Sequence, residues 1–351
     1  MLSPETVERA FRLILGRAPE SADVVEAHRR LPDEAALRET LLASPEFVEG
    51  HAARLARAGS GHEPDRADLN RAAEAGGAAQ GVLLPREPVE TEADGAARAR
   101  LWQRVARSWA ALGREAPHWS VLTHEAFRPE SLEANREAFG RSALAELELV
   151  DIALARLPGL EAGARDCLEI GCGVGRVTGG LAARFRRVIA VDISPEHLRI
   201  AEEELAAAGI GNVTTELMRR VEDYAALPPV GFLFTRIVLQ HNPPPVQAAI
   251  LRAALGRIEP GGAALFQVVT HGRDYRYSVA DDLARADAGM EMHVLPQARV
   301  FELIAAAGMI PVEVQEDFAA GNDGVYRSHL FLARRPAAGE AGPMDFARRG
   351  G

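Results

Sequence analysis

Three glycines in the middle of the chain have the spacing of a loop that binds a nucleoside-containing ligand. Gly171, Gly173 and Gly175 follow a short apolar segment that begins at Cys167. Because glycine has no side chain, the backbone can turn sharply there and expose its N–H groups to a ligand. Asp192 ends the next apolar segment, about 20 residues further on, where a carboxylate can bind the two hydroxyls of a ribose. The pattern therefore predicts a site for a nucleoside-bearing cofactor.

The glycine spacing distinguishes between two kinds of cofactor. A dinucleotide site has the pattern GxGxxG, whose third glycine lets the helix pack closely on the strand, and that position is Arg176 here. The run is instead GxGxG, with Glu169 before the first glycine. In this order the segment resembles motif I of the class I S-adenosylmethionine-dependent methyltransferases. The resemblance implies that Glu169, Gly171, Cys172, Gly173 and Gly175 surround the amino-acid end of S-adenosylmethionine, with Cys172 contributing backbone, and that Asp192 binds its ribose.

Two later motifs extend the resemblance over residues 140–335. The segment GFLFTRIVLQHNPPP is an apolar strand that ends in a polar loop, and the turn EPGG precedes the strand ALFQVVT. The resemblance implies an α/β fold, a Rossmann-like, doubly wound sheet of seven strands whose last strand is antiparallel. It also implies cofactor contacts from Ile193, Arg219 and Thr235. Where relatives often carry an acidic residue for the adenine amino group, this chain has Met218 and Arg219.

One histidine is placed to act as a base. His241 follows the fourth strand, at the edge of the sheet where ligands bind in such folds, and a histidine can remove a hydroxyl proton near neutral pH. The alternative is that His241 only shapes the loop. Two other segments, 117–132 and 271–296, are rich in aromatic and titratable side chains, so we expect them to hold the acceptor, with His124, Tyr275 and His293 as contacts. The alternatives are that the first segment only packs on the sheet and that the second is a surface loop.

The N-terminal part predicts a separate, small all-α module. Helix caps recur at Ser3, Ser21, Asp33 and Ser44, which indicates about four short helices. The motifs LILGRAP and LLASPEF resemble a small bacterial helical module of unknown function, with LGR and SPEF motifs. The predicted organisation is a module over 1–58, a linker over 59–100, a helical cap over 101–160, the cofactor domain over 161–335 and a flexible tail over 336–351. The module is expected to offer a surface to a protein partner.

Composition limits the other functions. The net charge of −10 argues against a nucleic-acid substrate, and the two cysteines are too few for a metal site or a disulfide framework. There is no apolar run long enough to span a membrane and no secretory profile, so we expect a cytoplasmic protein.

Together these features predict an S-adenosylmethionine-dependent methyltransferase that transfers a methyl group to a hydroxyl of a small molecule or glycan. An NAD(P)-dependent oxidoreductase and a non-catalytic, cofactor-binding scaffold are the alternatives.

Overall fold

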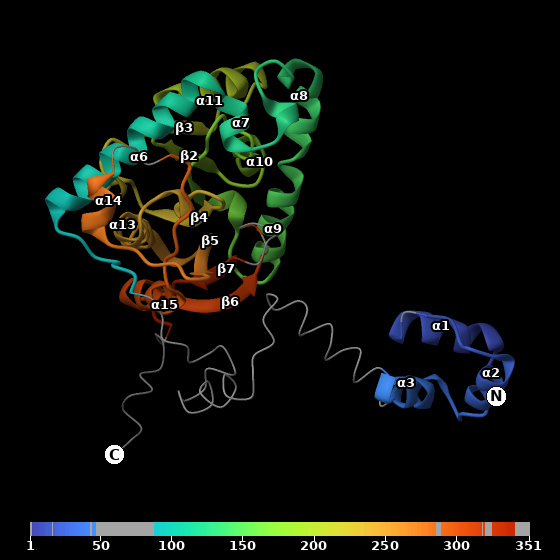
Figure 1. Ribbon diagram of the computed structural model, residues 1–351. Helices are drawn as coiled ribbons and strands as arrows, with labels where there is room; N and C mark the ends of the chain where they lie inside the picture. Colours follow the sequence, from blue (N-terminus) through green and yellow to red (C-terminus); the bar gives the residue numbers. More distant parts are fainter. Residues whose placement is uncertain are drawn as a thin grey trace. The chain divides into compact units, whose positions relative to one another are not determined.

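The computed structural model describes residues 2–15, 17–42, 44–46, 88–285, 289–317, 319 and 325–340. The chain divides into two compact units, residues 1–86 and 87–351 (Figure 1), which are described separately below. Most of the expected linker and the end of the expected tail lie outside the described residues, as does most of the helix expected after Ser44.

The described part of the N-terminal unit contains three helices, α1 Pro4–Ile14, α2 Ala22–Arg29 and α3 Glu34–Leu42. Each begins at a predicted cap: Ser3, Ser21 and Asp33 accept hydrogen bonds from the backbone N–H groups of their helices' first turns. Their apolar faces meet in a small core, Val7, Phe11, Leu37 and Leu41. These helices thus form a core of their own.

The second unit contains one seven-stranded sheet in the order β3-β2-β1-β4-β5-β7-β6. The strands are β1 Asp166–Ile170, β2 Arg187–Asp192, β3 Val213–Leu217, β4 Val230–Thr235, β5 Ile258–Gly272, β6 Ile310–Glu316 and β7 Tyr326–Arg334. β1 to β5 pair in parallel, and β7 runs antiparallel to both β5 and β6. This confirms the predicted doubly wound sheet with its last strand antiparallel. The EPGG turn differs from expectation: it lies within β5, at a point where the pairing with β4 shifts register.

Helices cover both faces of the sheet because its strands are apolar on both sides. Neighbouring side chains in a strand point to opposite faces. Leu168 therefore packs in one core with α13 Pro244–Leu255 and α15 Gln297–Ala306, whereas Cys167 packs in the other with α9 Leu144–Ala155 and α10 Thr178–Ala182. Figure 1 shows these two pairs of helices on opposite sides of the strands.

Nine further helices occur in the described part of the second unit. They are α6 Gly95–Glu115, α7 Pro117–Val121, η2 Glu125–Phe127, α8 Leu132–Arg141, η3 Ala162–Ala164, α11 Pro195–Ala207, α12 Asp223–Ala226, η4 Leu239–His241 and α14 Val279–Ala284. α6 begins earlier than the apolar pattern from Leu101 predicts, because Asp94 caps it by accepting a hydrogen bond from the N–H of Ala97. The indole of Trp102 donates to the carbonyl of Arg219 at 2.8 Å, which fixes α6 to the end of β3. Within the described residues, no helix has the length and apolarity needed to cross a membrane.

Candidate functional site

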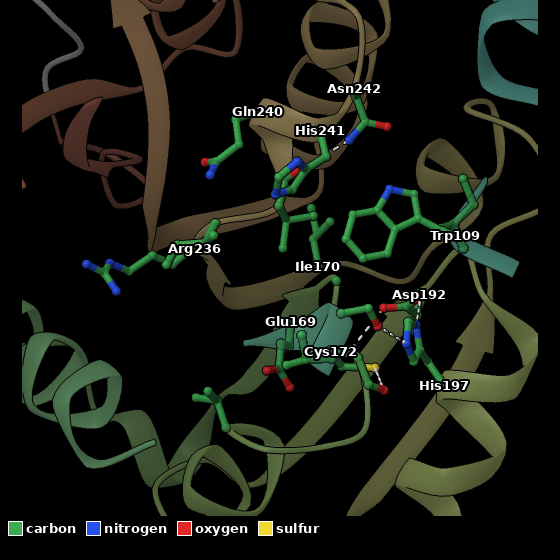
Figure 2. A pocket seen from close by; sticks show the side chains of 18 of the residues that line it. Trp109, Glu169, Ile170, Cys172, Asp192, His197, Arg236, Gln240, His241 and Asn242 are labelled. Carbon is green, nitrogen blue, oxygen red and sulfur yellow. Dashed lines mark hydrogen bonds and ion pairs between the residues drawn. The ribbon is translucent and has the colours of Figure 1, made fainter. Parts of the chain in front are cut away.

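A cavity of about 410 Å³ opens at the carboxyl ends of β1, β2 and β4. In this sheet the strand order changes direction between β1 and β4, which is where open α/β sheets bind ligands. Figure 2 shows two walls: Glu169, Cys172, Asp192 and His197 on one side, and Gln240, His241 and Asn242 on the other. Trp109 of α6 lies between them at one end.

The glycine loop forms the floor of this cavity in a conformation that suits glycine. Gly171 and Gly173 have φ angles of +74° and +55°, in the left-handed region that side chains disfavour. A Cβ atom at Gly171 would lie 2.4 Å from a methyl of Val238, and one at Gly173 would lie 2.6 Å from a methyl of Val121. The loop therefore brings bare backbone to the cavity wall.

Asp192 connects this loop to the second strand. Its carboxylate accepts hydrogen bonds from the N–H groups of Gly173 at 2.9 Å and Ser194 at 2.8 Å, and it lines the cavity although it is buried. Fixed in this way by two backbone donors, the carboxylate can accept further hydrogen bonds from a ligand without losing its position.

Glu169 supplies a second carboxylate to the same wall. It is buried, and its Oε2 has no hydrogen-bond partner among the residues that the structure describes. Burial raises the pKa of Glu169 to about 7. A buried polar atom without a partner is rare in folded proteins and marks a position where a ligand can complete the bonding.

The loop after β4 brings His241 to the opposite wall. Its Nδ1 lies 3.1 Å from the carbonyl oxygen of Glu291. Because a carbonyl only accepts hydrogen bonds, Nδ1 carries the proton and Nε2 has the free lone pair in the neutral imidazole. Burial lowers the pKa of His241, so the neutral form predominates at pH 7. The ring centroid lies 5.3 Å from that of Trp109.

The cavity brings together most of the predicted cofactor residues. Glu169, Gly171, Cys172, Gly173, Asp192 and Ile193 line it, and so does the predicted base His241. Gly175, Arg219 and Thr235 do not line it. Arg219 is exposed, while Thr235 is buried between two residues that do line the cavity.

The predicted acceptor residues lie elsewhere. His124 is exposed and caps η2 by accepting a hydrogen bond from the N–H of Ala126. Tyr275 and His293 hydrogen-bond to each other at 3.0 Å and line a second cavity, of about 570 Å³. Met292 lines both cavities. The structure thus does not bring these three side chains into the cavity that contains His241.

Several cavity residues carry no recognisable signal in the sequence. A buried ion-pair network joins the glycine loop to α9 and β4: Glu146 bonds Arg236 at 2.6 Å and Arg176 at 3.3 Å. Ser120 and His197 also line the cavity. No local pattern marks these residues, because the partners lie 30 to 90 positions apart in the chain.

Within the described ranges, no group of three or more His, Cys, Asp or Glu side chains is placed to hold a metal ion. The chemistry available at this cavity comes from its carboxylates, its backbone donors and its histidines.

Comparisons with known proteins agree with the resemblance found in the sequence. A family profile described as a methyltransferase domain matches residues 167–262. The ubiquinone biosynthesis O-methyltransferase of Xanthomonas euvesicatoria pv. vesicatoria (strain 85-10) is 34% identical over 103 residues, which are 29% of this chain and 41% of that protein. The match thus spans less than half the length of this curated relative.

Two solved structures are also similar. The magnesium protoporphyrin IX methyltransferase of Synechocystis PCC 6803 with bound S-adenosylhomocysteine has 17% identity and a TM-score of 0.47, covering 67% of this chain and 99% of that one. The N-methyltransferase NodS of Bradyrhizobium japonicum WM9, in complex with S-adenosylhomocysteine, has 16% identity and a TM-score of 0.42, covering 68% and 99%.

Proposed function

We propose, from the premise that residues 167–262 belong to the methyltransferase domain family, that this protein is an S-adenosylmethionine-dependent methyltransferase acting on a hydroxyl group of a small molecule. The observation that carries the proposal is that the glycine loop, Glu169 and Asp192 line one cavity together with His241, whose Nδ1 is held by the Glu291 carbonyl. Cofactor and acceptor can therefore meet there.

The residues present fit the proposed cofactor. Asp192 is positioned to accept hydrogen bonds from ribose hydroxyls, and the unpaired Oε2 of Glu169 can accept one from the ammonium group of the methionine end. Gly171 and Gly173 line the cavity, so their backbone can contact that end. Ile193 and Tyr224 line the cavity next to Asp192 and supply apolar surface for the adenine. When bound, S-adenosylmethionine supplies a methyl group activated by a positively charged sulfur.

His241 provides the proton acceptor. An acceptor hydroxyl within hydrogen-bond reach of Nε2 can pass its proton to that nitrogen while its oxygen bonds to the methyl group. His241 would then hold this proton as an imidazolium, which would balance the positive charge that the cofactor would lose together with its methyl group. Orientation of the two reactants by the cavity walls contributes the larger part of the rate.

The lining of the cavity favours an acceptor with an apolar body. Trp109, Leu122, Ile237, Met290 and Met292 line it beside the polar side chains. Burial of an apolar molecule against such walls is favourable. The hydroxyls of an unsubstituted sugar would find few hydrogen-bond partners there. We therefore favour a small molecule over a glycan as the acceptor.

Calorimetric titration of the full chain with S-adenosylhomocysteine, S-adenosylmethionine and NADH tests the proposal. We expect saturable binding of the first two and none of NADH. Binding of NADH alone would favour the oxidoreductase alternative, and binding of none would favour a scaffold that has lost the cofactor. Methyl transfer from labelled S-adenosylmethionine to a panel of hydroxylated aromatic and aliphatic compounds then tests the reaction.

The protein partner of the N-terminal module and the cytoplasmic location stay predictions. Tryptic removal of residues 1–86 followed by the same titration would show whether cofactor binding needs the N-terminal unit; we expect that it does not, because every residue lining the cavity belongs to the second unit.

A further inference from the structure

Glu291, in the segment after β5, hydrogen-bonds to the predicted base through its carbonyl, and its side chain is held by a charged partner. We propose that Glu291 and Arg285 are positioning residues for His241: their ion pair holds the Glu291 carbonyl where it keeps the proton on Nδ1 and leaves Nε2 free. This inference depends on the proposed role of His241, but its test does not depend on turnover.

The first step is the contact with the imidazole. Nδ1 of His241 donates to the Glu291 carbonyl at 3.1 Å. In a neutral histidine only one ring nitrogen carries a proton, and the hydrogen bonds of the ring decide which one it is. If this carbonyl moved away, both tautomers would be populated. In the tautomer protonated at Nε2, this nitrogen cannot take the proton of the hydroxyl that is to be methylated.

The second step is the two-point ion pair. Arg285 donates from Nη1 to one carboxylate oxygen of Glu291 at 2.5 Å and from Nη2 to the other at 2.9 Å. Paired contacts of this kind fix orientation as well as distance. The side chains are 48% and 32% exposed, so an isolated pair would contribute little to stability. Its value lies in holding the residue that carries the carbonyl.

The third step anchors Arg285 to the interior. Its Nη2 also bonds the carboxylate of Asp282 at 2.5 Å. Asp282 is buried and accepts further hydrogen bonds from Arg104 of α6 at 2.7 Å and from the hydroxyl of Tyr277 at 2.7 Å. A continuous set of polar contacts therefore runs from α6 through Asp282, Arg285 and Glu291 to His241.

The same helix also contacts His241 directly. Trp109, five positions after Arg104 in α6, places its ring 5.3 Å from the imidazole. The aromatic contact limits how the ring can tilt, and the Glu291 carbonyl determines its protonation. Both constraints therefore depend on α6, which couples the predicted base to the helix over the cavity.

The nearby histidine does not replace this arrangement. Nε2 of His293 lies 3.4 Å from the Glu291 carboxylate, but burial lowers the pKa of His293 to about 4, so it is neutral at pH 7. The backbone has a separate attachment, since the N–H of His293 donates to the carbonyl of Gln240 at 2.7 Å. The segment should therefore stay folded when the ion pair is removed, which allows the pair to be tested by itself.

The test uses full-length protein labelled with nitrogen-15 in its histidines. Long-range proton–nitrogen NMR spectra distinguish the two tautomers, and the His241 signals are assigned by their loss in His241→Gln. The parent should show predominantly the form protonated at Nδ1. Arg285→Gln and Glu291→Gln should each shift His241 to a mixture with at least a tenfold larger share of the other tautomer. Arg285→Lys, which keeps the charge but not the two-point geometry, should restore part of the parent pattern.

Two controls keep the outcome decisive. Glu302→Gln removes an exposed carboxylate that pairs with Arg299 on α15, and it should leave the His241 signals unchanged. Each variant is also titrated with S-adenosylhomocysteine, where we expect dissociation constants within twofold of the parent. Parent-like tautomer patterns in both Arg285→Gln and Glu291→Gln would overturn the inference. If the parent binds no S-adenosylhomocysteine, the proposed function fails while the tautomer readout still decides this point.

Discussion

Nε2 of His197 lies 2.9 Å from the hydroxyl oxygen of Ser120, and this hydrogen bond joins α11 to α7. Since the Ser120 hydroxyl donates to the carbonyl of Pro117, the proton of the shared bond comes from His197. His197 follows Asp192 in the chain by five positions, and both line the cavity. The helical segment before the sheet is thus attached directly beside the predicted ribose-binding carboxylate.

We expect Asp192→Ala to weaken S-adenosylmethionine binding by at least tenfold. Loss of charged hydrogen bonds to the ribose corresponds to about 1.4 kcal/mol. Calorimetry gives the affinity, and thermal unfolding shows whether the variant is folded, because Asp192 also bonds Gly173 and Ser194. Asp151→Ala, which removes a half-exposed partner of Arg184, is the control. Unchanged affinity in a folded Asp192 variant would refute the assignment.

Glu169 should make cofactor binding dependent on pH. Burial raises its pKa to about 7, and a ligand with an ammonium group binds the ionised carboxylate. Affinity for S-adenosylhomocysteine should therefore rise from pH 6 to about pH 8 and level off above, with up to about a tenfold change. Calorimetry in buffers of different ionisation enthalpy measures the proton released. Glu169→Gln should remove this dependence, and identical pH profiles in parent and variant would exclude the role.

His241→Ala should lower turnover by at least tenfold while leaving cofactor affinity within about twofold, because the base acts on the acceptor. Since burial lowers the pKa of His241, the active neutral form persists below pH 6.5, and turnover should decline only at more acidic pH. Rates with an identified acceptor between pH 5 and 8 measure both effects. The exposed His271 provides the control, His271→Ala. Parent-like turnover in the His241 variant would reduce this residue to a structural role.

His293 should contribute to acid destabilisation. Its pKa is about 4 in the folded protein against an ordinary value of 6.5. As the pH falls, His293 is therefore protonated in the unfolded chain before it is protonated in the folded protein. The stability that neutral His293 contributes is present above pH 6.5 and is lost as the pH falls from there towards 4. The loss is at most about 3 kcal/mol. Urea unfolding at pH 7 and 5 should show a smaller difference in His293→Gln than in the parent. Equal differences would contradict the prediction.

Arg104→Met should lower the free energy of unfolding by about 3 kcal/mol, because it removes a buried cation from a buried carboxylate. Asp282 keeps Tyr277 and Arg285 as partners, so the protein should still fold. The double variant Arg104→Met with Asp282→Asn should recover part of the loss, since the carboxylate charge is then gone. Denaturant titration measures each value, and Arg199→Met, in an exposed pair with Glu196, is the control. If Arg104→Met lowers the free energy of unfolding no more than Arg199→Met does, the pair of Arg104 with Asp282 contributes little to stability.

Sequence alone predicted most of the residues that line the cavity at the glycine loop. The conformation of the glycine loop is a local property, because Gly171 and Gly173 need left-handed φ angles that only their own residue type tolerates readily. Asp192 could be assigned because strand lengths place it at the edge shared by all parallel strands. The seven strands and the antiparallel last strand were implied by the resemblance and are confirmed by the strand pairing.

Sequence did not determine the acceptor half, where the structure departs from expectation at His124, Tyr275 and His293. Their chemistry was suggestive, but whether a loop side chain faces one cavity or its neighbour depends on packing between segments far apart in the chain. The tautomer of His241 likewise depends on a carbonyl 50 residues away. Local pattern therefore predicted the glycine loop and its carboxylates, and only tertiary contacts decided which side chains share a cavity with them, because hydrogen bonds and burial between distant segments have no signature in either segment alone.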